Sequence, residues 1–265
     1  MIISTPHATH FEIAESLVTR GVHVHIDKPL CSTLTQVDEL IVRADACHVF
    51  LSTHTQRKYM PGQSQLKSYL QKYFSELYHV SGSIWQPLFD DYAGSWRADR
   101  TLAAGGILMD SGYHVVDTIV SLLGSGSTQI RDIAALAHSA NNRNDSFVTL
   151  VFRMGRTVVQ VNAFRGTPKA LKKEEYQVLG DGGHIALKYT GSGREKTCQT
   201  VFWAADGRTR ETEDLTLTSS YTFHPLQLFL DALRGNHVAR TVMQDNIAVA
   251  RTTLFILHEA YSRDI

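Results

Sequence analysis

Residues 23–29, HVHIDKP, carry the clearest indication of the fold. Apolar side chains alternate through the first half of this stretch, which predicts a β-strand that ends at Lys28. Pro29 restricts Lys28 to an extended backbone. A lysine at the carboxyl end of a parallel strand faces the crevice where open α/β sheets bind ligands. Lys28 is therefore a candidate proton or hydrogen-bond donor to a reacting oxygen. The alternative is a solvated lysine at a strand end.

A second informative stretch is GGILMDSGYHVVD, residues 105–117. On a helix, Asp110 and His114 are four residues apart and share a face, and Asp117 extends the same stripe. A histidine near a carboxylate suits acid–base chemistry near neutral pH. Gly105 and Gly106, just before the predicted helix, would let a ligand approach its positive end. The alternative is a polar stripe opposite a core-facing side.

Outward from these stretches, the pattern predicts an α/β fold in two parts. Residues 1–53 alternate strand, helix, strand, helix, strand, which is typical of βαβ units and a parallel, partly Rossmann-like sheet. From residue 57 the chain predicts a larger α+β domain with an open mixed or antiparallel sheet. We expect one continuous helix over 106–123, and closing helices over 225–233 and 245–261. The predicted domains are 1–56 and 57–265.

Composition excludes several classes of protein. Lysine plus arginine and aspartate plus glutamate both number 26, so nothing favours nucleic acid or an anionic membrane as a partner. Three scattered cysteines without a C-x-x-C pair fit a reducing cytoplasm. His23 and His25 lie on one strand face, but no third ligand follows at a metal-binding spacing, so we expect no metal site. We also expect no membrane segment.

Taken together, the motifs resemble the Gfo/Idh/MocA oxidoreductase family over nearly the whole chain. The family's T-P-x-x-x-H and G-x-H-V-x-x-E-K-P are similar to residues 5–10 and 21–29, with Asp27 in place of the usual glutamate. Its R-[FY]-x-P resembles residues 58–61, and its G-G-G-x-L-x-D-x-G-x-H-x-x-D resembles residues 104–117. Glu259-Ala260-Tyr261 is similar to its closing motif.

The resemblance implies NAD or NADP as cofactor and a sugar, inositol or related polyol as substrate. It implies a catalytic set of Lys28, Asp110 and His114, in which His114 exchanges the hydroxyl proton, Asp110 orients it and Lys28 holds the reacting oxygen. Tyr59 would join these three in binding substrate. The expected cofactor-binding residues are Thr5, Pro6, His10, Asp27, Lys28, Pro29, Trp96 and Arg97. Family members commonly form dimers or tetramers through the open face of the second sheet.

One departure from the family pattern limits these expectations. No G-x-G-x-x-G turn occurs in the sequence, and the chain begins at what would be the family's fourth strand, about 60–70 residues in if each βαβ unit takes about 30. We therefore expect this chain alone to bind NAD(P) weakly or not at all, and to be inactive by itself. Two functions stay open, an oxidoreductase and a catalytically inactive sugar-binding or oligomerisation remnant. A metal-dependent hydrolase is disfavoured by the incomplete ligand set.

Overall fold

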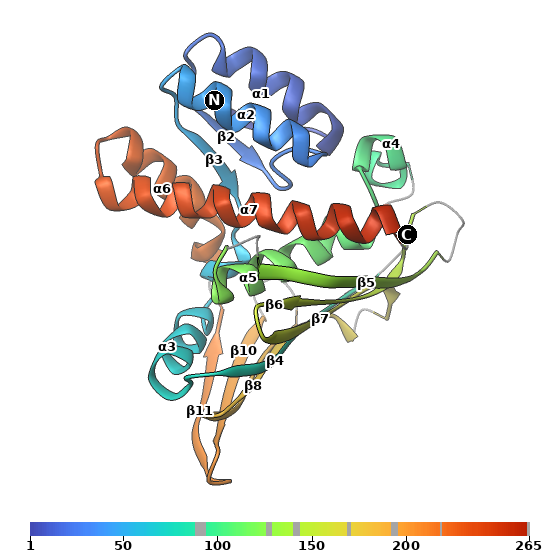
Figure 1. The fold of residues 1–265 in the computed structure, drawn as a ribbon, viewed down its shortest axis with the longest axis vertical. Helices are drawn as coiled ribbons and strands as arrows, with labels where there is room; N and C mark the ends of the chain where they lie inside the picture. The colour runs from blue at the N-terminus through green and yellow to red at the C-terminus, as the bar shows by residue number, and fades with distance from the viewer. Residues whose placement is uncertain are drawn as a thin grey trace.

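The computed structural model describes residues 1–87, 94–125, 129–139, 144–168, 171–191, 196–217 and 219–263. Within them the strands form two sheets (Figure 1). The smaller sheet has the order β1-β2-β3 and is parallel throughout. Its strands are β1 (Ile2–Ile3), β2 (Val24–Asp27) and β3 (Leu51–His54). The predicted parallel βαβ piece is confirmed.

Local sequence explains the two helices that connect these strands. The helix α2 (Leu34–Ala46) begins at a capping box, in which the Thr33 side chain accepts from the Gln36 amide and the Gln36 side chain accepts from the Thr33 amide. The helix α1 spans His10–Val18, although a proline at residue 6 is typical of the first position of a helix. Pro6 instead precedes a short 3-10 turn, η1 (His7–Thr9). This turn leaves Thr5 and Pro6 in the loop after β1, at the carboxyl edge of the sheet.

The larger sheet has the order β11-β10-β9-β8-β4-β7-β6-β5. Only β4 and β7 pair in parallel and the other neighbours are antiparallel, so the predicted mixed sheet is confirmed. Its strands are β4 (Leu77–Pro87), β5 (Ile130–His138), β6 (Phe147–Met154), β7 (Thr157–Thr167), β8 (Lys173–Gly180), β9 (Gly183–Thr190), β10 (Thr197–Ala204) and β11 (Thr209–Thr216).

Helices occupy the space between the two sheets (Figure 1). The helix α5 (Tyr113–Leu123) packs on β4, and α7 (His237–Arg263) packs on α5, on β3 and on β5. The helix α7 begins eight residues before the predicted start at 245, because His237–Gln244 continue the same helix. The remaining helices are α3 (Gln63–Tyr73), α4 (Arg100–Ala103) and α6 (His224–Leu233). The helix α7 is thus in contact with both sheets.

The helix predicted over 106–123 is not continuous. Leu108–Gly112 form a π-helical turn, η5, before α5 begins at Tyr113. Hydrogen bonds of the i→i+5 type add one residue to the turn, so residues on either side of it no longer keep α-helical spacing. The expectation that Asp110 and His114 share a face rested on that spacing. The described residues show no contact between these two side chains, and their shared face stays a prediction.

In the part of the chain that the structure describes, no helix covers the other face of the larger sheet (Figure 1). Leu136, Val151, Leu179 and Trp203 are exposed hydrophobic side chains on its strands. In the described part of the chain, no helix has the length and apolar character that a membrane span requires.

Gly82 of β4 offers a test of how the sheet packs on α5. A Cβ at this position would collide with Val115 of α5 and come within 3.1 Å of Ile119. We predict that Gly82→Val lowers the free energy of unfolding by about 1–3 kcal/mol, the usual cost of overpacking a core. Urea denaturation measures this change. Ser83→Val is the control, since Ser83 points to the opposite face, and a loss as large in the control would contradict the packing argument.

Candidate active site

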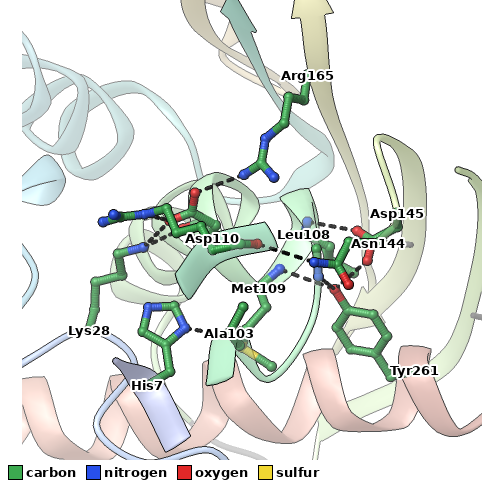
Figure 2. Close-up of polar contacts among 12 residues, drawn as sticks. His7, Lys28, Ala103, Leu108, Met109, Asp110, Asn144, Asp145, Arg165 and Tyr261 are labelled. Atoms are coloured by element: carbon green, nitrogen blue, oxygen red, sulfur yellow. Dashed lines mark hydrogen bonds and ion pairs between the residues drawn. The ribbon is translucent and has the colours of Figure 1, made fainter. Parts of the chain in front are cut away.

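The centre of the candidate site is a buried ion pair between the two sheets. Lys28 follows the last residue of β2, and Asp110 lies on the π-turn η5. The Lys28 ammonium donates to the Asp110 carboxylate at 2.9 Å and to its backbone carbonyl at 2.7 Å (Figure 2). Lys28 is only 7% exposed. Lys28 is therefore not a solvated lysine at a strand end.

Two arginines complete the contacts of Asp110. Arg165, on β7, donates to the second carboxylate oxygen at 2.8 Å (Figure 2). The Arg97 guanidinium lies 3.9 Å from the first oxygen. Burial acts to raise the pKa of Asp110, but the Lys28 ammonium and the two guanidiniums outweigh it and hold the pKa well below the usual range. Asp110 is therefore an anion throughout the physiological pH range.

Arg165 was not a sequence-based candidate, although the sequence contains a signal for it. Val159, Val161 and Ala163 alternate as buried residues along β7, and Arg165 continues this inward-facing series. An arginine at a core position needs an anionic partner, because burying an unpaired charge is costly. Strand alternation therefore places Arg165 on the helix-covered face, and the tertiary structure supplies the carboxylate.

His114 is the second residue of α5, directly after the π-turn. Its ring is buried, and Nδ1 has no hydrogen-bond partner among the described residues. Burial, followed by the positive charges of Lys28 and Arg57, lowers the pKa of His114 well below its ordinary value. The ring is therefore neutral at pH 7 and can accept a proton.

The carboxylates near His114 have other partners. The Asp110 oxygens accept from Lys28 and Arg165, and no described contact joins Asp110 to the His114 ring. Asp117 forms a buried ion pair with Lys58 at 3.1 Å. The expected polar stripe of Asp110, His114 and Asp117 is therefore divided among separate partners.

The residues expected at the cofactor lie along the carboxyl ends of the parallel strands. His10 joins two of these loops, because its ring nitrogens lie 3.0 Å from the Thr5 carbonyl oxygen and 2.8 Å from that of Pro29. The Asp27 carboxylate accepts from the Lys28 backbone amide at 2.9 Å. Pro6 begins the turn η1 beside them.

Trp96 and Arg97 approach this edge from the other part of the chain. The Trp96 ring packs against His7 with 4.7 Å between centroids, and the Arg97 guanidinium lies 4.4 Å from the Trp96 ring centroid. Burial and the nearby Lys28 charge lower the pKa of His7 to about 3, so this ring is neutral. The edge is therefore lined by neutral rings beside the cations that surround Asp110.

Tyr59 lies apart from this centre. Its hydroxyl accepts from the Asn246 side chain at 2.8 Å, and its ring packs on His224 with 4.3 Å between centroids. Tyr59 lines a pocket between the start of α3, α5 and α7. No described contact joins Tyr59 to Lys28 or His114, and its substrate contact stays a prediction.

A second charged cluster near His114 was not foreseen. Arg57 of the 3-10 turn η2 (Arg57–Tyr59) pairs with the buried Glu174 of β8, which also accepts from the Tyr176 hydroxyl at 2.7 Å. Lys196, just before β10, lies near this cluster. Both cations act on the pKa of the His114 ring. Arg57, Glu174 and Lys196 are far apart in the sequence, so no spacing pattern could have predicted that the fold brings them together.

The glycine pair before the π-turn serves packing. A Cβ on Gly106 would collide with the side chain and carbonyl of Asp145. Asp145 accepts from the Leu108 amide at 3.0 Å and from the Tyr261 hydroxyl at 3.0 Å (Figure 2). The same hydroxyl lies 3.1 Å from the Gly106 amide nitrogen. The position that the sequence suggested for a ligand is therefore filled by protein, and α7 supports the π-turn through Tyr261.

The described residues contain no group of three or more histidine, cysteine, aspartate or glutamate side chains that could hold a metal ion. The suspected pair divides between different partners. His23 accepts from the Phe50 amide at 2.8 Å, whereas the His25 ring contacts Ser52 at 2.9 Å and His54 at 3.0 Å.

Comparison with known proteins identifies both parts of the chain. Residues 1–55 match the oxidoreductase family with an NAD-binding Rossmann fold, and residues 67–186 match the GFO/IDH/MocA C-terminal domain. A scyllo-inositol 2-dehydrogenase (NADP+) of Bacillus subtilis is 25% identical over 198 residues, which cover 74% of this chain and 53% of that protein. A 1,5-anhydro-D-fructose reductase of Ensifer adhaerens is 24% identical over 147 residues, which cover 52% of this chain and 40% of that protein.

The chain spans about a third to a half of the length of the curated relatives it matches. Solved structures show the same fold. KijD10, a 3-ketoreductase of Actinomadura kijaniata in complex with NADP and TDP-benzene, aligns with a TM-score of 0.79 at 16% identity, over 100% of this chain and 78% of that one. The WlbA dehydrogenase of Bordetella pertussis, in complex with NADH and UDP-GlcNAcA, aligns with a TM-score of 0.76 at 19% identity. The alignment covers 98% of this chain and 75% of that one.

The ion pair of Asp110 makes a prediction about stability and pH. Asp110→Asn leaves Lys28 and Arg165 without their buried counter-ion, so we expect a loss of about 3–5 kcal/mol in the free energy of unfolding at pH 7. The folded pKa of Asp110 is lowered, so its stabilising effect is complete above the unfolded value of about 3.9 and is lost as pH falls through the folded pKa.

Urea denaturation of both proteins between about pH 3 and pH 7 measures this effect, and the gap between them should narrow at the acid end. Asp45→Asn, on the exposed face of α2, is the control with the same chemical change. A gap that stays constant with pH would show that the carboxylate charge is not what stabilises the fold.

Proposed function

The chain belongs to the Gfo/Idh/MocA oxidoreductase family, and on that premise we propose that it carries the substrate side of an NAD(P)-dependent oxidoreductase. The proposed reaction transfers a hydride between NAD(P) and a hydroxyl-bearing or carbonyl carbon of a sugar, inositol or related polyol. One observation carries the proposal. A buried ion pair holds Lys28 against the turn that leads into α5, which bears the neutral ring of His114.

His114 is the proposed acid–base residue. In the oxidising direction its neutral ring takes the proton of the substrate hydroxyl. The hydride on the carbon that bears this hydroxyl passes to the oxidised cofactor, and that carbon becomes a carbonyl. Lys28 is the proposed donor to the reacting oxygen, where its ammonium would stabilise developing negative charge. In the reducing direction the same groups act in reverse, and protonated His114 returns the proton.

Asp110 takes a different role from the one the motif suggests. Its carboxylate contacts Lys28 and Arg165, and its backbone carbonyl accepts a second bond from Lys28. We propose that Asp110 positions the Lys28 ammonium and balances its charge, and that packing of α5 orients His114. The proposed catalytic groups are thus Lys28 and His114, with Asp110 as a positioning residue.

The nicotinamide cofactor, when bound, supplies the hydride acceptor or donor. The described residues fit one end of such a cofactor. Thr5, Pro6, His10, Asp27 and Pro29 lie at the carboxyl ends of β1 and β2, the edge where open α/β sheets bind ligands. Trp96 packs on His7 at the same edge, and Arg97 lies over the Trp96 ring. The glycine turn that would hold the pyrophosphate is absent from the sequence.

We also propose that copies of the chain associate through the open face of the larger sheet. Exposed Leu136, Val151, Leu179 and Trp203 lie on this face, and a large exposed apolar surface is typical of a protein interface.

A change at His114 tests the proposed chemistry. Because cofactor binding is expected to be weak, we predict that the chain reduces NAD⁺ or NADP⁺ only when the cofactor is supplied well above its expected millimolar dissociation constant, together with a panel of inositols and sugars. Absorbance at 340 nm measures the reduction. His114→Asn should lower that rate about 10²–10⁴-fold, the usual contribution of a general acid–base group.

His237→Asn is the matched control, because His237 lies exposed at the start of α7, away from Lys28. It should leave the rate unchanged. Equal rates for the two variants would reject His114 as the acid–base residue. Sugar binding without any cofactor reduction would favour the alternative of an inactive sugar-binding protein.

A separate prediction concerns cofactor affinity. The contacts of a glycine turn and its helix N-terminus are absent, and if they are worth even ~4 kcal/mol, a micromolar site becomes roughly millimolar at about 1.4 kcal/mol per tenfold. Calorimetry should therefore give a millimolar dissociation constant for NAD(H) or NADP(H) with this 265-residue chain. Micromolar binding would mean that another surface holds the pyrophosphate.

A further inference from the structure

Lys196 lies near the proposed active site and has no counter-ion among the described residues. It is half-buried just before β10, and none of the described carboxylates lies within ion-pairing distance of it. Its ammonium has only weak polar or aromatic contacts. These are the Met60 sulfur at 3.9 Å and the ring centroids of Tyr189 at 5.3 Å and Tyr221 at 6.0 Å.

The groups around Lys196 carry an excess of positive charge. Arg57 and Lys172 are the cations near it, and Glu174 is the one described carboxylate that acts on it. Glu174 is already held by Arg57 and by the Tyr176 hydroxyl. The thiol of Cys198 donates to the Pro61 carbonyl, and the Tyr189 hydroxyl donates to the same carbonyl. Three cations therefore share one carboxylate.

Lys196 also belongs to the surroundings of His114. The positive charges of both Lys28 and Lys196 act on the His114 ring, from opposite parts of the chain. Electrostatic interactions extend over several ångströms in a partly buried site. A substrate whose reacting carbon lies between Lys28 and His114 is therefore also exposed to the field of Lys196.

An anion bound at Lys196 would be energetically favourable. A partly desolvated ammonium without a counter-ion is unfavourable. Burial first, then Arg57 and Lys172, lower the pKa of Lys196 to about 8. A carboxylate or phosphate bound there would form a charge-assisted hydrogen bond, which is about twice as strong as a neutral one.

We propose that Lys196 determines substrate specificity by binding an anionic substituent, so that this site prefers acidic sugars to neutral sugars and inositols. The proposal rests on the proposed function, since it places the anion on the substrate of the Lys28 and His114 site. A sugar carboxylate and a sugar phosphate share the chemistry required. Binding measurements with both kinds of sugar tell them apart.

Calorimetry on the full chain with D-glucose, D-glucuronate and D-glucose 6-phosphate tests the preference. Glucuronate differs from glucose only in a carboxylate for a hydroxymethyl group. We expect at least one of the acidic sugars to bind about tenfold more tightly than glucose, equivalent to about 1.4 kcal/mol. The acidic sugar that binds more tightly identifies the substituent.

Three variants assign the preference to Lys196. Lys196→Gln should reduce the preference for acidic sugars to near unity, and Lys196→Arg should retain it. Lys188→Gln is the matched control, because Lys188 is exposed on the open face of the same sheet. It should bind all three sugars like the unaltered chain. Near-unaltered glucose binding by Lys196→Gln would show that this variant keeps the site intact.

The pH dependence gives an independent measurement. The ammonium of Lys196 is lost as pH rises through about 8, so the preference for acidic sugars should be full near pH 6.5 and decline above pH 8. Equal binding of glucose and both acidic sugars, or a preference that survives Lys196→Gln, would overturn this inference and leave the proposed function standing. Failure of all three sugars to bind would overturn this inference alone, because the proposed function is tested separately by cofactor reduction with the panel of inositols and sugars.

Discussion

The candidate site depends on one interaction, the ion pair that Lys28 forms with Asp110. Lys28 ends a strand of the small parallel sheet, and Asp110 lies on the π-turn that leads into α5. Two buried charges of opposite sign stabilise the fold only when both are present and well oriented. The geometry of the pair therefore fixes how the small sheet meets the helix that carries His114.

The supporting contacts of this pair extend through much of the molecule. Arg165 reaches Asp110 from the larger sheet, and Tyr261 near the end of α7 holds the glycine-rich turn through Asp145 (Figure 2). The closing residues of the chain thus support the start of the π-turn. π-Turns often mark functional sites, and this one directs Asp110 toward Lys28 while His114 continues on α5.

Charge is distributed unevenly about the site. Asp110 is surrounded by Lys28, Arg97 and Arg165, and Glu174 is shared by Arg57 and Tyr176. Burial, followed by this positive field, lowers the pKa of His114 and keeps its ring neutral, which a proton acceptor requires. The same field favours anions, so one arrangement of charges bears on both the proposed acid–base step and the proposed substrate preference.

The sequence by itself determined the βαβ order of residues 1–53, the mixed sheet that follows, and Lys28, Asp110 and His114 as residues of interest. Hydrophobic period and strand-end position are local properties, and they survive folding. Tertiary structure alone decided which side chains meet. A π-turn interrupts the predicted helix at Asp110, which pairs with Lys28 and Arg165, and Asp145 fills the space beside Gly106. Arg57, Arg165 and Lys196 joined the site from distant segments, because long-range pairing is set by the packing of whole elements and not by any spacing along the chain.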